Sequence, residues 1–187
     1  MVQKKEFSKE EALRKALDVF WQKGYYNTSI QDLVDALCLG RGSIYNFFGS
    51  KKRLFISSLE LYIKQRNKDL KIKFETNPAK EVFKELLESI IYTKGINKGC
   101  FVVNEMNEMA VSDKEVSAIL NKSEDDLINM FNSAILPLSK NSKENSLDIS
   151  LFLSNTMKGL RVLSKMNRDK EELSKIIDVS LGVLDKI

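Results

Sequence analysis

Helix-start signals followed by apolar residues at helical spacing recur along most of the chain. Ser8 to Glu11 and Asp169 to Glu172 have the pattern of a capping box, in which the first side chain accepts a hydrogen bond from a first-turn N–H group. Apolar residues then follow at intervals of three and four, as one face of an α-helix requires. Only two prolines and eight glycines interrupt the chain, which disfavours a turn-rich β fold. The sequence therefore predicts an all-α protein of about nine helices.

Composition narrows the class of protein further. No apolar run approaches the ~18 residues of a membrane-spanning helix, and no apolar stretch of a secretory signal follows the first charges. The two cysteines do not form a disulfide framework, so a cytoplasmic location is expected. The chain has no histidine, which removes Ser-His-Asp and Cys-His catalysis and His-ligated zinc. We therefore expect no enzyme, no cofactor and no metal site.

The N-terminal third of the chain is basic, whereas the rest is close to neutral. Residues 1–75 carry a net charge of +6 and residues 76–187 carry −2. This asymmetry predicts a module that faces a polyanion and a body that does not. A random fluctuation of surface lysines is the alternative, because charge alone does not identify the partner.

Two short predicted helices lie within this basic third. A capping box at Thr28 to Gln31 begins the first helix, and Ile44, Phe47 and Phe48 mark a second of about two turns after a break at residues 38–40. Such a pair is typical of a helix-turn-helix, whose second helix can enter the major groove of DNA. Short paired helices alone are a weak signal, because many helical proteins contain them.

The residue string across this pair is more specific. Residues 28–55 read TSIQDLVDALCLGRGSIYNFFGSKKRLF. They resemble the DNA-binding domain of the tetracycline-repressor (TetR/AcrR) family of bacterial regulators, whose typical pattern is T-x-x-x-I-A-x-x-A-G-V-[ST]-x-G-[ST]-[LI]-Y-x-[HY]-F-x-[ST]-K-x-x-L. The resemblance is specific over residues 8–60, and beyond them it covers only helix pattern and length. The matching residues are Thr28, Ala36, Gly42, Ser43, Ile44, Tyr45, Phe48, Ser50, Lys51 and Leu54.

The resemblance implies how the chain is divided. An N-terminal helix-turn-helix DNA-binding domain is expected over residues 1–50, a linking helix over 51–75, and a C-terminal helical ligand-binding and dimerisation domain over 76–187. Asn77-Pro78 is the clearest boundary, because Asn suits a helix N-cap and Pro suits the first helical position. The implied partners are a palindromic double-stranded DNA operator, a second copy of the chain and a small-molecule effector, with no membrane.

The implied DNA contacts lie in and around the second short helix. Arg41 can pair with guanine or bind phosphate, and Asn46 is the next candidate for a base contact. Tyr45 and Lys51 occupy family positions that hold phosphates, and Lys51 lies near a helix N-terminus that favours anions. The predicted DNA-binding residues are Thr28, Arg41, Gly42, Ser43, Tyr45, Asn46, Phe47 and Lys51.

Several residues depart from the family pattern. Cys38 stands where the family usually has a turn glycine, so a positive φ there would cost about 1 kcal/mol. Gly40 replaces the usual Ser/Thr cap, and this lowers the stability by only about a few tenths of a kcal/mol. Leu37 and Phe47 are more apolar than typical, so a phosphate contact from a tyrosine hydroxyl at position 47 is absent. These departures keep the fold and alter the expected operator contacts.

The second half of the chain is expected to bind the effector. Methionine and aromatic side chains adapt to irregular apolar ligands, although core packing explains each of them singly. No charged cluster predicts the charge of the ligand, and Glu105 and Glu108 either face a cationic ligand or lie on the surface. The candidate pocket residues are Tyr92, Phe101, Met106, Met109, Met130, Phe131, Phe152 and Met157.

The last two predicted helices carry the implied dimer interface. Apolar stripes on residues 147–165 and 170–187 suit a four-helix bundle between two copies, or an ordinary intramolecular hairpin. The interface candidates are Leu153, Leu160, Leu173, Ile177, Leu181 and Leu184.

Cys100 is a candidate redox residue. Residues 99–104 resemble a G-C-[LF]-[LV]-x-N segment of many family members, in some of which the cysteine senses electrophiles or oxidants. A predicted helix start and the nearby Lys98 favour the thiolate. The apolar residues 101–103 favour burial instead, since a free cysteine is often a small core residue. Both roles stay open.

These patterns predict a ligand-responsive, DNA-binding transcriptional regulator, most simply a repressor that a small-molecule effector releases from its operator. The effector would shift helix 51–75 and so change the spacing of two recognition helices, which must match half-sites on DNA. A thiol-based redox or electrophile-sensing repressor acting through Cys100 is one alternative. The alternative from another functional class is a small helical enzyme that contains the same helix-turn-helix motif.

Overall fold

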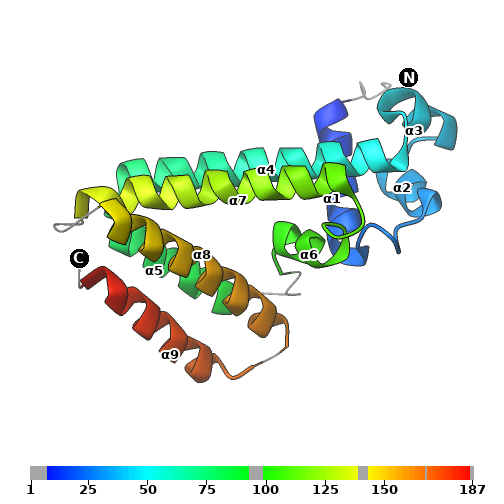
Figure 1. Ribbon diagram of the computed structural model, residues 1–187. Coiled ribbons are helices and arrows are strands. Elements are labelled where there is room, and N and C mark those ends of the chain that lie inside the picture. The colour runs from blue at the N-terminus through cyan, green and yellow to red at the C-terminus, as the bar shows by residue number, and fades with distance from the viewer. Residues whose placement is uncertain (1–7, 93–98, 139–142, 167, 186–187) are drawn as a thin grey trace, which may run out of the picture.

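A computed structural model describes residues 8–92, 99–138, 143–166 and 168–185 of the chain (Figure 1). These residues form nine α-helices and two short 3₁₀-helices without any strand, which confirms the all-α prediction. None of the helices in the described segments has the length and apolar character needed to cross a membrane. In chain order the elements are α1 Lys9–Lys23, α2 Ile30–Leu37, α3 Arg41–Phe48, α4 Lys51–Thr76, α5 Ala79–Ile91, α6 Phe101–Glu108, α7 Lys114–Ile135, η1 Leu136–Leu138, α8 Lys143–Lys165, α9 Lys170–Leu181 and η2 Gly182–Asp185.

Two hydrophobic cores hold these helices together. The first joins α1, α2, α3 and the first half of α4 to α6 and the start of α7, and Phe55 at its centre contacts both Phe20 and Phe101, with ring centres 5.2 and 5.9 Å apart. The second joins the end of α4 to α5, α8, α9 and the rest of α7. The long helices α4 and α7 lie side by side and take part in both cores (Figure 1). Helix α6 therefore packs with the N-terminal helices although it comes late in the chain.

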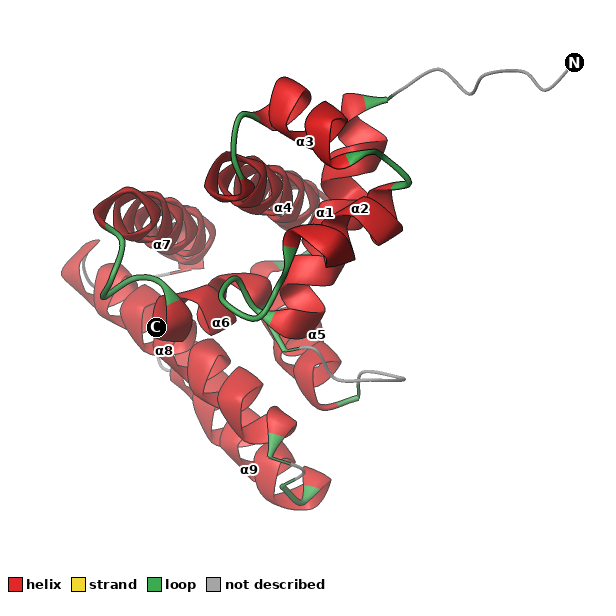
Figure 2. Cartoon of the chain, turned by 90° about the vertical axis from the view of Figure 1, so that its right-hand side faces the viewer, coloured by secondary structure: helices red, strands yellow, loops and turns green. Residues whose placement is uncertain are grey.

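The two short N-terminal helices and the two C-terminal helices lie at opposite ends of the molecule. Figure 2 shows α2 and α3 beside the start of α4, far from α9. At the other end α5 packs against both α8 and α9. Any influence of one end on the other must therefore travel through α4, α6 or α7.

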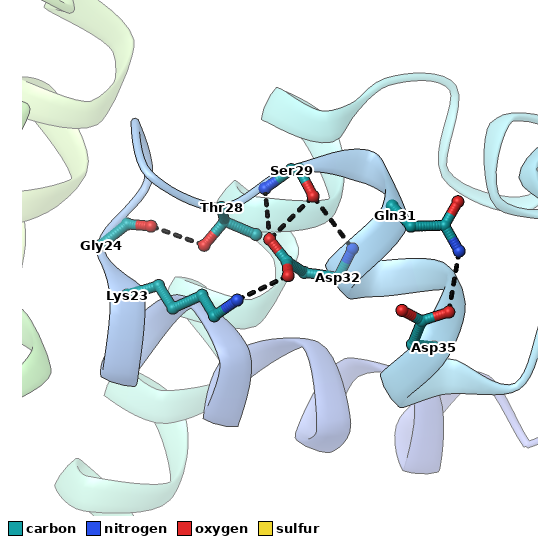
Figure 3. Close-up of polar contacts among 7 residues, drawn as sticks. All are labelled: Lys23, Gly24, Thr28, Ser29, Gln31, Asp32 and Asp35. Carbon is teal, nitrogen blue, oxygen red and sulfur yellow. Dashed lines mark hydrogen bonds and ion pairs between the residues drawn. The ribbon is translucent and has the colours of Figure 1, made fainter.

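Capping side chains begin α1 and α9 at the positions the sequence marks, and two other helix starts need correction. The N-cap of α5 is Pro78, whereas Asn77 ends α4. Ser8 accepts from the Glu11 N–H group, as predicted. The capping box of α2 starts at Ser29 and not at Thr28: Ser29 Oγ accepts from the Asp32 N–H group at 3.1 Å, and the Asp32 carboxylate accepts from Ser29 N–H at 2.8 Å (Figure 3). The Lys23 ammonium lies 2.5 Å from the same carboxylate. The hydrogen bond from Lys23 and those from Ser29 lower the pKa of Asp32 to about 2.

The turn between α2 and α3 adopts the conformation that the sequence predicts to be strained. Cys38 has φ 53° and ψ 38°, and it is the one residue other than glycine with a positive φ in the described part of the chain. We expect Cys38→Gly to raise the free energy of unfolding by about 0.5–1 kcal/mol, because relief of left-handed strain exceeds the extra freedom of glycine in the unfolded chain. Urea titration measures this change. Cys38→Ala retains the strain and is the control, and a glycine variant no more stable than the alanine variant would contradict the prediction.

The six residues predicted to face a partner are buried inside the single chain instead. Apolar side chains of α8 and α9 pack against α5 and the end of α7 in the second core. The buried faces are therefore already used within one copy, which corrects the predicted dimer surface. The residues concerned are Leu153, Leu160, Leu173, Ile177, Leu181 and Leu184, all at most 8% exposed.

Candidate nucleic-acid interface and effector cavity

Helix α3 has one buried face and one open face. Ile44 and Phe48 are buried in the first core, as the sequence predicts, and they hold the helix against α2 and α4. The opposite face is open around Gly42, where an added Cβ would meet no atom of the described residues within 4 Å. The exposed residues of α3 are Arg41, Gly42, Tyr45, Asn46 and Phe47, with Ser43 half-buried.

The start of α3 offers backbone donors to an anion. Its N-cap, Gly40, makes no side-chain hydrogen bond to the first turn. The first N–H groups of a helix lack intrahelical partners and lie at the positive end of its dipole. Arg41, the first residue of α3, adds a full positive charge at the same point. This combination suits the phosphate backbone of a nucleic acid.

Two of the predicted DNA-contact residues have side chains that are engaged by other residues of the chain. Thr28 is only 1% exposed, and its hydroxyl donates to the Gly24 carbonyl at 2.6 Å (Figure 3). Its side chain therefore stabilises the corner between α1 and α2 and is not offered to DNA, which corrects the prediction for this residue. The Lys51 ammonium lies 4.4 Å from the centre of the Tyr25 ring, where it makes a cation–π contact. Burial lowers the pKa of Lys51.

The end of α6 is tied directly to the helix-turn-helix. The Glu108 carboxylate accepts from the Tyr26 N–H group at 2.8 Å. It also lies against Gly24, where a Cβ would come within 2.3 Å of a Glu108 oxygen. Just beyond α6, the Asp113 carboxylate pairs with Lys52 of α4 at 2.7 Å. Sequence reasoning missed these contacts because they join residues 61 to 84 positions apart, and Glu108 faces a backbone N–H group instead of a cationic ligand.

Glu105, one turn earlier on α6, is completely buried, and neither carboxylate oxygen has a hydrogen-bond partner within the described residues. Burial, with a smaller contribution from Glu108, raises the pKa of Glu105 from 4.5 to about 8. The folded protein then holds a proton that the unfolded chain has lost between these two pH values. Folding stability should therefore fall as pH rises from 4.5 to 8, by up to about 1.4 kcal/mol per pH unit.

We expect Glu105→Gln to remove this pH dependence, because a neutral amide needs no proton to stay buried. The free energy of unfolding by urea, measured at pH 5.5 and pH 8, should drop more in the original protein than in the variant, by up to about 3 kcal/mol. Glu60→Gln, at an exposed position on α4, is the control. Equal pH dependence in the Glu105 variant and the original protein would contradict the assignment.

A cavity of about 80 Å³ lies among α4, α5, α6, α7 and α8. Of the eight predicted pocket residues, Met106 and Met157 line it. Phe101 and Met109 are buried in the first core and Phe131 in the second, where its ring centre lies 4.8 Å from that of Phe83. The remaining three do not line the cavity either: Met130 packs partly buried on the second core, whereas Tyr92 and Phe152 are exposed.

Cys100 also lines this cavity, as the N-cap residue of α6. Its side chain is buried, and the sulfur lies 3.6 Å from the Tyr62 hydroxyl. Lys98, which the sequence places near it, lies outside the described residues. The sequence did not indicate the charged residues of the cavity wall, which come from α4, α7 and α8: Arg66, Glu124, Lys158 and Arg161.

Comparison with known proteins agrees with this architecture. Residues 12–57 match the model of the tetR family of bacterial regulatory proteins. The chain is 28% identical to the uncharacterized HTH-type transcriptional regulator YezE of Bacillus subtilis (strain 168), over 99% of this chain and all of that protein. It is 27% identical to the HTH-type transcriptional repressor ComR of Escherichia coli (strain K12), over 62% of this chain and 58% of ComR.

A solved structure shows the same fold with nucleic acid bound. It is a cysteine mutant of the TetR-family transcriptional regulator CifR in complex with 26-bp double-strand operator DNA. The similarity has a TM-score of 0.79 at 25% identity and covers 94% of this chain and 95% of that one. With the helix-turn-helix at its N-terminus and a helical body behind it, the chain carries over residues 12–57 a domain that matches the tetR family of bacterial regulatory proteins, and it is a DNA-binding transcriptional regulator.

Proposed function

We propose that this regulator is a cytoplasmic, homodimeric repressor that binds a palindromic operator and leaves it when a small-molecule effector enters the cavity. The observation that carries the proposal is the position of α6. Val102, Val103 and Met106 line the cavity, whereas Glu108 on the same helix contacts the helix-turn-helix through Tyr26. An occupant that moves α6 therefore acts on both places at once.

The route to DNA runs through two short connections. Glu108 contacts the α1–α2 corner, and Asp113 pairs with Lys52 at the start of α4. A shift of α6 would turn the N-terminal helices relative to the body and so change the separation of the two α3 helices in a dimer. Two half-sites one helical turn apart, or a multiple of it, tolerate little change in that separation.

A second apolar stripe on α8 suits the dimer interface. Phe152, Val162 and Met166 are exposed at helical spacing, with Gly159 between them, and a Cβ at Gly159 would meet no described residue within 4 Å. The small residue allows a second helix to approach closely. On α9, Val179 is also an exposed apolar residue, with 73% of its surface exposed. We propose that this exposed stripe, and not the buried one, packs against the second copy.

The decisive experiment is selection of binding sites from a random DNA library, followed by fluorescence anisotropy on the enriched sequence. A palindromic site bound by one dimer, with affinity falling steeply as salt rises, supports the proposal. Binding without sequence preference, or by monomers, would overturn it. The chain has no histidine and belongs to a family of regulators, which supports the proposal that it is not an enzyme.

The thiol-based alternative would act at the same cavity. Because Cys100 is buried there, an oxidant or electrophile must enter the cavity to reach it. Alkylation of Cys100 in a Cys38→Ser background separates the two models. Release of the operator on alkylation favours the thiol sensor, whereas unchanged DNA binding after complete alkylation excludes it.

A further inference from the structure

We infer that the effector of the cavity is a small organic carboxylate with a short apolar body, held by Arg161 and Arg66. The inference rests on the proposed function and adds the chemistry of the ligand. It comes from the charges and hydrogen bonds of the cavity wall and from the volume of the cavity.

The wall carries more positive than negative charge. Its charged residues are Arg66, Arg161, Lys158 and Glu124. The Lys158 ammonium lies 2.5 Å from Glu124 Oε1, and the Ser154 hydroxyl donates to that same oxygen at 2.6 Å. This one carboxylate is therefore already paired. Two guanidinium groups remain without an acidic partner within the described residues.

The guanidinium of Arg161 has a hydrogen-bond donor that the described residues do not use. Its Nε is buried and has no hydrogen-bond partner among the residues that the structure describes. Its Nη2 lies 3.9 Å from Met157 Sδ, and a thioether is a weak acceptor. A buried N–H donor of a cation is unfavourable when no acceptor reaches it. A carboxylate matches this donor well, because its two oxygens fit the planar fork of a guanidinium.

Arg66 faces the same cavity from α4. It donates to Asn67 Oδ1 at 2.8 Å and to Ser123 Oγ at 2.9 Å, which are both neutral acceptors. These bonds fix the orientation of the guanidinium without an ion pair to a carboxylate of the described residues. Burial lowers the pKa of Arg66, and this effect exceeds the opposing attraction of Glu124.

The rest of the wall sets the size and polarity of the ligand. Leu70, Leu127, Val102 and Met106 offer apolar contacts. A volume of about 80 Å³ holds roughly six to ten non-hydrogen atoms. A ligand of this size has room for one carboxylate and a single ring or short chain. Bound between Arg66 on α4 and Arg161 on α8, it would also contact α6, which carries the connection to the helix-turn-helix.

The test compares acids with neutral isosteres on the full chain in the absence of DNA. Benzoate and hexanoate are the probes, and benzamide and hexanamide are the matched controls, with binding measured by isothermal titration calorimetry and by the shift in Tm. We expect the acids to bind and to raise Tm, and the amides to bind at least about tenfold more weakly. Arg161→Met should weaken binding of the acids about tenfold or more, whereas Arg161→Lys should restore part of it.

Two controls keep the result interpretable. Arg168→Met, at an exposed position before α9, should leave binding of the acids unchanged. Far-UV circular dichroism establishes that each variant is folded, and Arg66→Met replaces Arg161→Met if the latter is not. Equal binding of acids and amides, acid binding unaffected by the cavity variants, or no binding of either acid up to about 10 mM would each overturn the inference.

Operator binding is measured separately on the same preparations. Intact operator binding with no response to the acids contradicts the carboxylate assignment and leaves the repressor proposal standing. Acid binding in a chain that recognises no operator contradicts the repressor proposal and supports the chemistry of the cavity.

Discussion

Replacing Val162 with glutamate is expected to convert the dimer into monomers and to lower operator affinity by at least about 100-fold. Val162 is 43% exposed on the open apolar stripe of α8, between Gly159 and Met166. A carboxylate there would be removed from water in the dimer without a positive partner. The loss of affinity follows because a monomer binds one half-site and forgoes the gain from binding two at once. Multi-angle light scattering measures the mass, and fluorescence anisotropy measures the affinity.

A matched substitution separates loss of the interface from loss of the fold. Ile72 on α4 is similarly exposed, at 47%, and lies outside the stripe. Ile72→Glu should leave both the mass and the operator affinity unchanged. Far-UV circular dichroism should report the same helix content in both variants. A Val162→Glu protein that stays dimeric and binds normally would show that the second copy packs elsewhere.

Removal of the Arg41 side chain should nearly abolish recognition of the operator. Arg41 is exposed at the N-terminus of α3, where no capping side chain competes with a DNA group. A bidentate contact with guanine contributes about 1–3 kcal/mol, and a dimer makes it twice, so Arg41→Ala should cost roughly 30- to 20,000-fold in operator affinity. Anisotropy on the operator and on a scrambled duplex measures both affinity and preference.

The two duplexes distinguish base recognition from attraction to phosphate. If Arg41 reads a base, the operator loses more affinity than the scrambled duplex, and the preference between them shrinks. The slope of log affinity against log salt should stay steep, because the remaining cations still displace counterions from the phosphates. Arg14→Ala, which removes an exposed cation paired with Glu10 on α1, should leave the preference unchanged. Equal losses of affinity for both duplexes would show that Arg41 contacts phosphate and not a base.

The helices were predictable because their signals are local. A capping side chain lies three residues from the N–H group it accepts, so the sequence around Ser8 is enough to place the start of α1. At the start of α2 the local sequence pattern is not enough to identify the N-cap residue. Thr28 and Ser29 are both good caps, and the choice between them depends on Thr28 being buried against the Gly24 carbonyl. That choice depends on the conformation of the corner between α1 and α2, which the capping pattern alone does not describe.

The dimer surface was placed on the wrong face of α8 for a related reason. Leu153 and Leu160 form one buried apolar row, whereas Phe152 and Val162 belong to another row that is exposed. Helical spacing describes both rows equally well. Only the position of α5 and α7 decides which row is covered within the chain and which stays open. The cavity presents the same difficulty, since Arg66 and Arg161 are 95 residues apart and meet only in the folded protein.

The contact of Phe55 with Phe101 has a consequence for how such regulators can be recombined. The helices that bind DNA share their hydrophobic core with α6 and with the start of α7, so part of their interior is supplied from beyond the long helix α4. A fragment that ended at Thr76 would present the Phe101-binding face of Phe55 to water. The DNA-binding helices of this protein therefore do not form a domain that can be transferred on its own. Grafting it onto a different sensory body would require that body to bring its own replacement for α6.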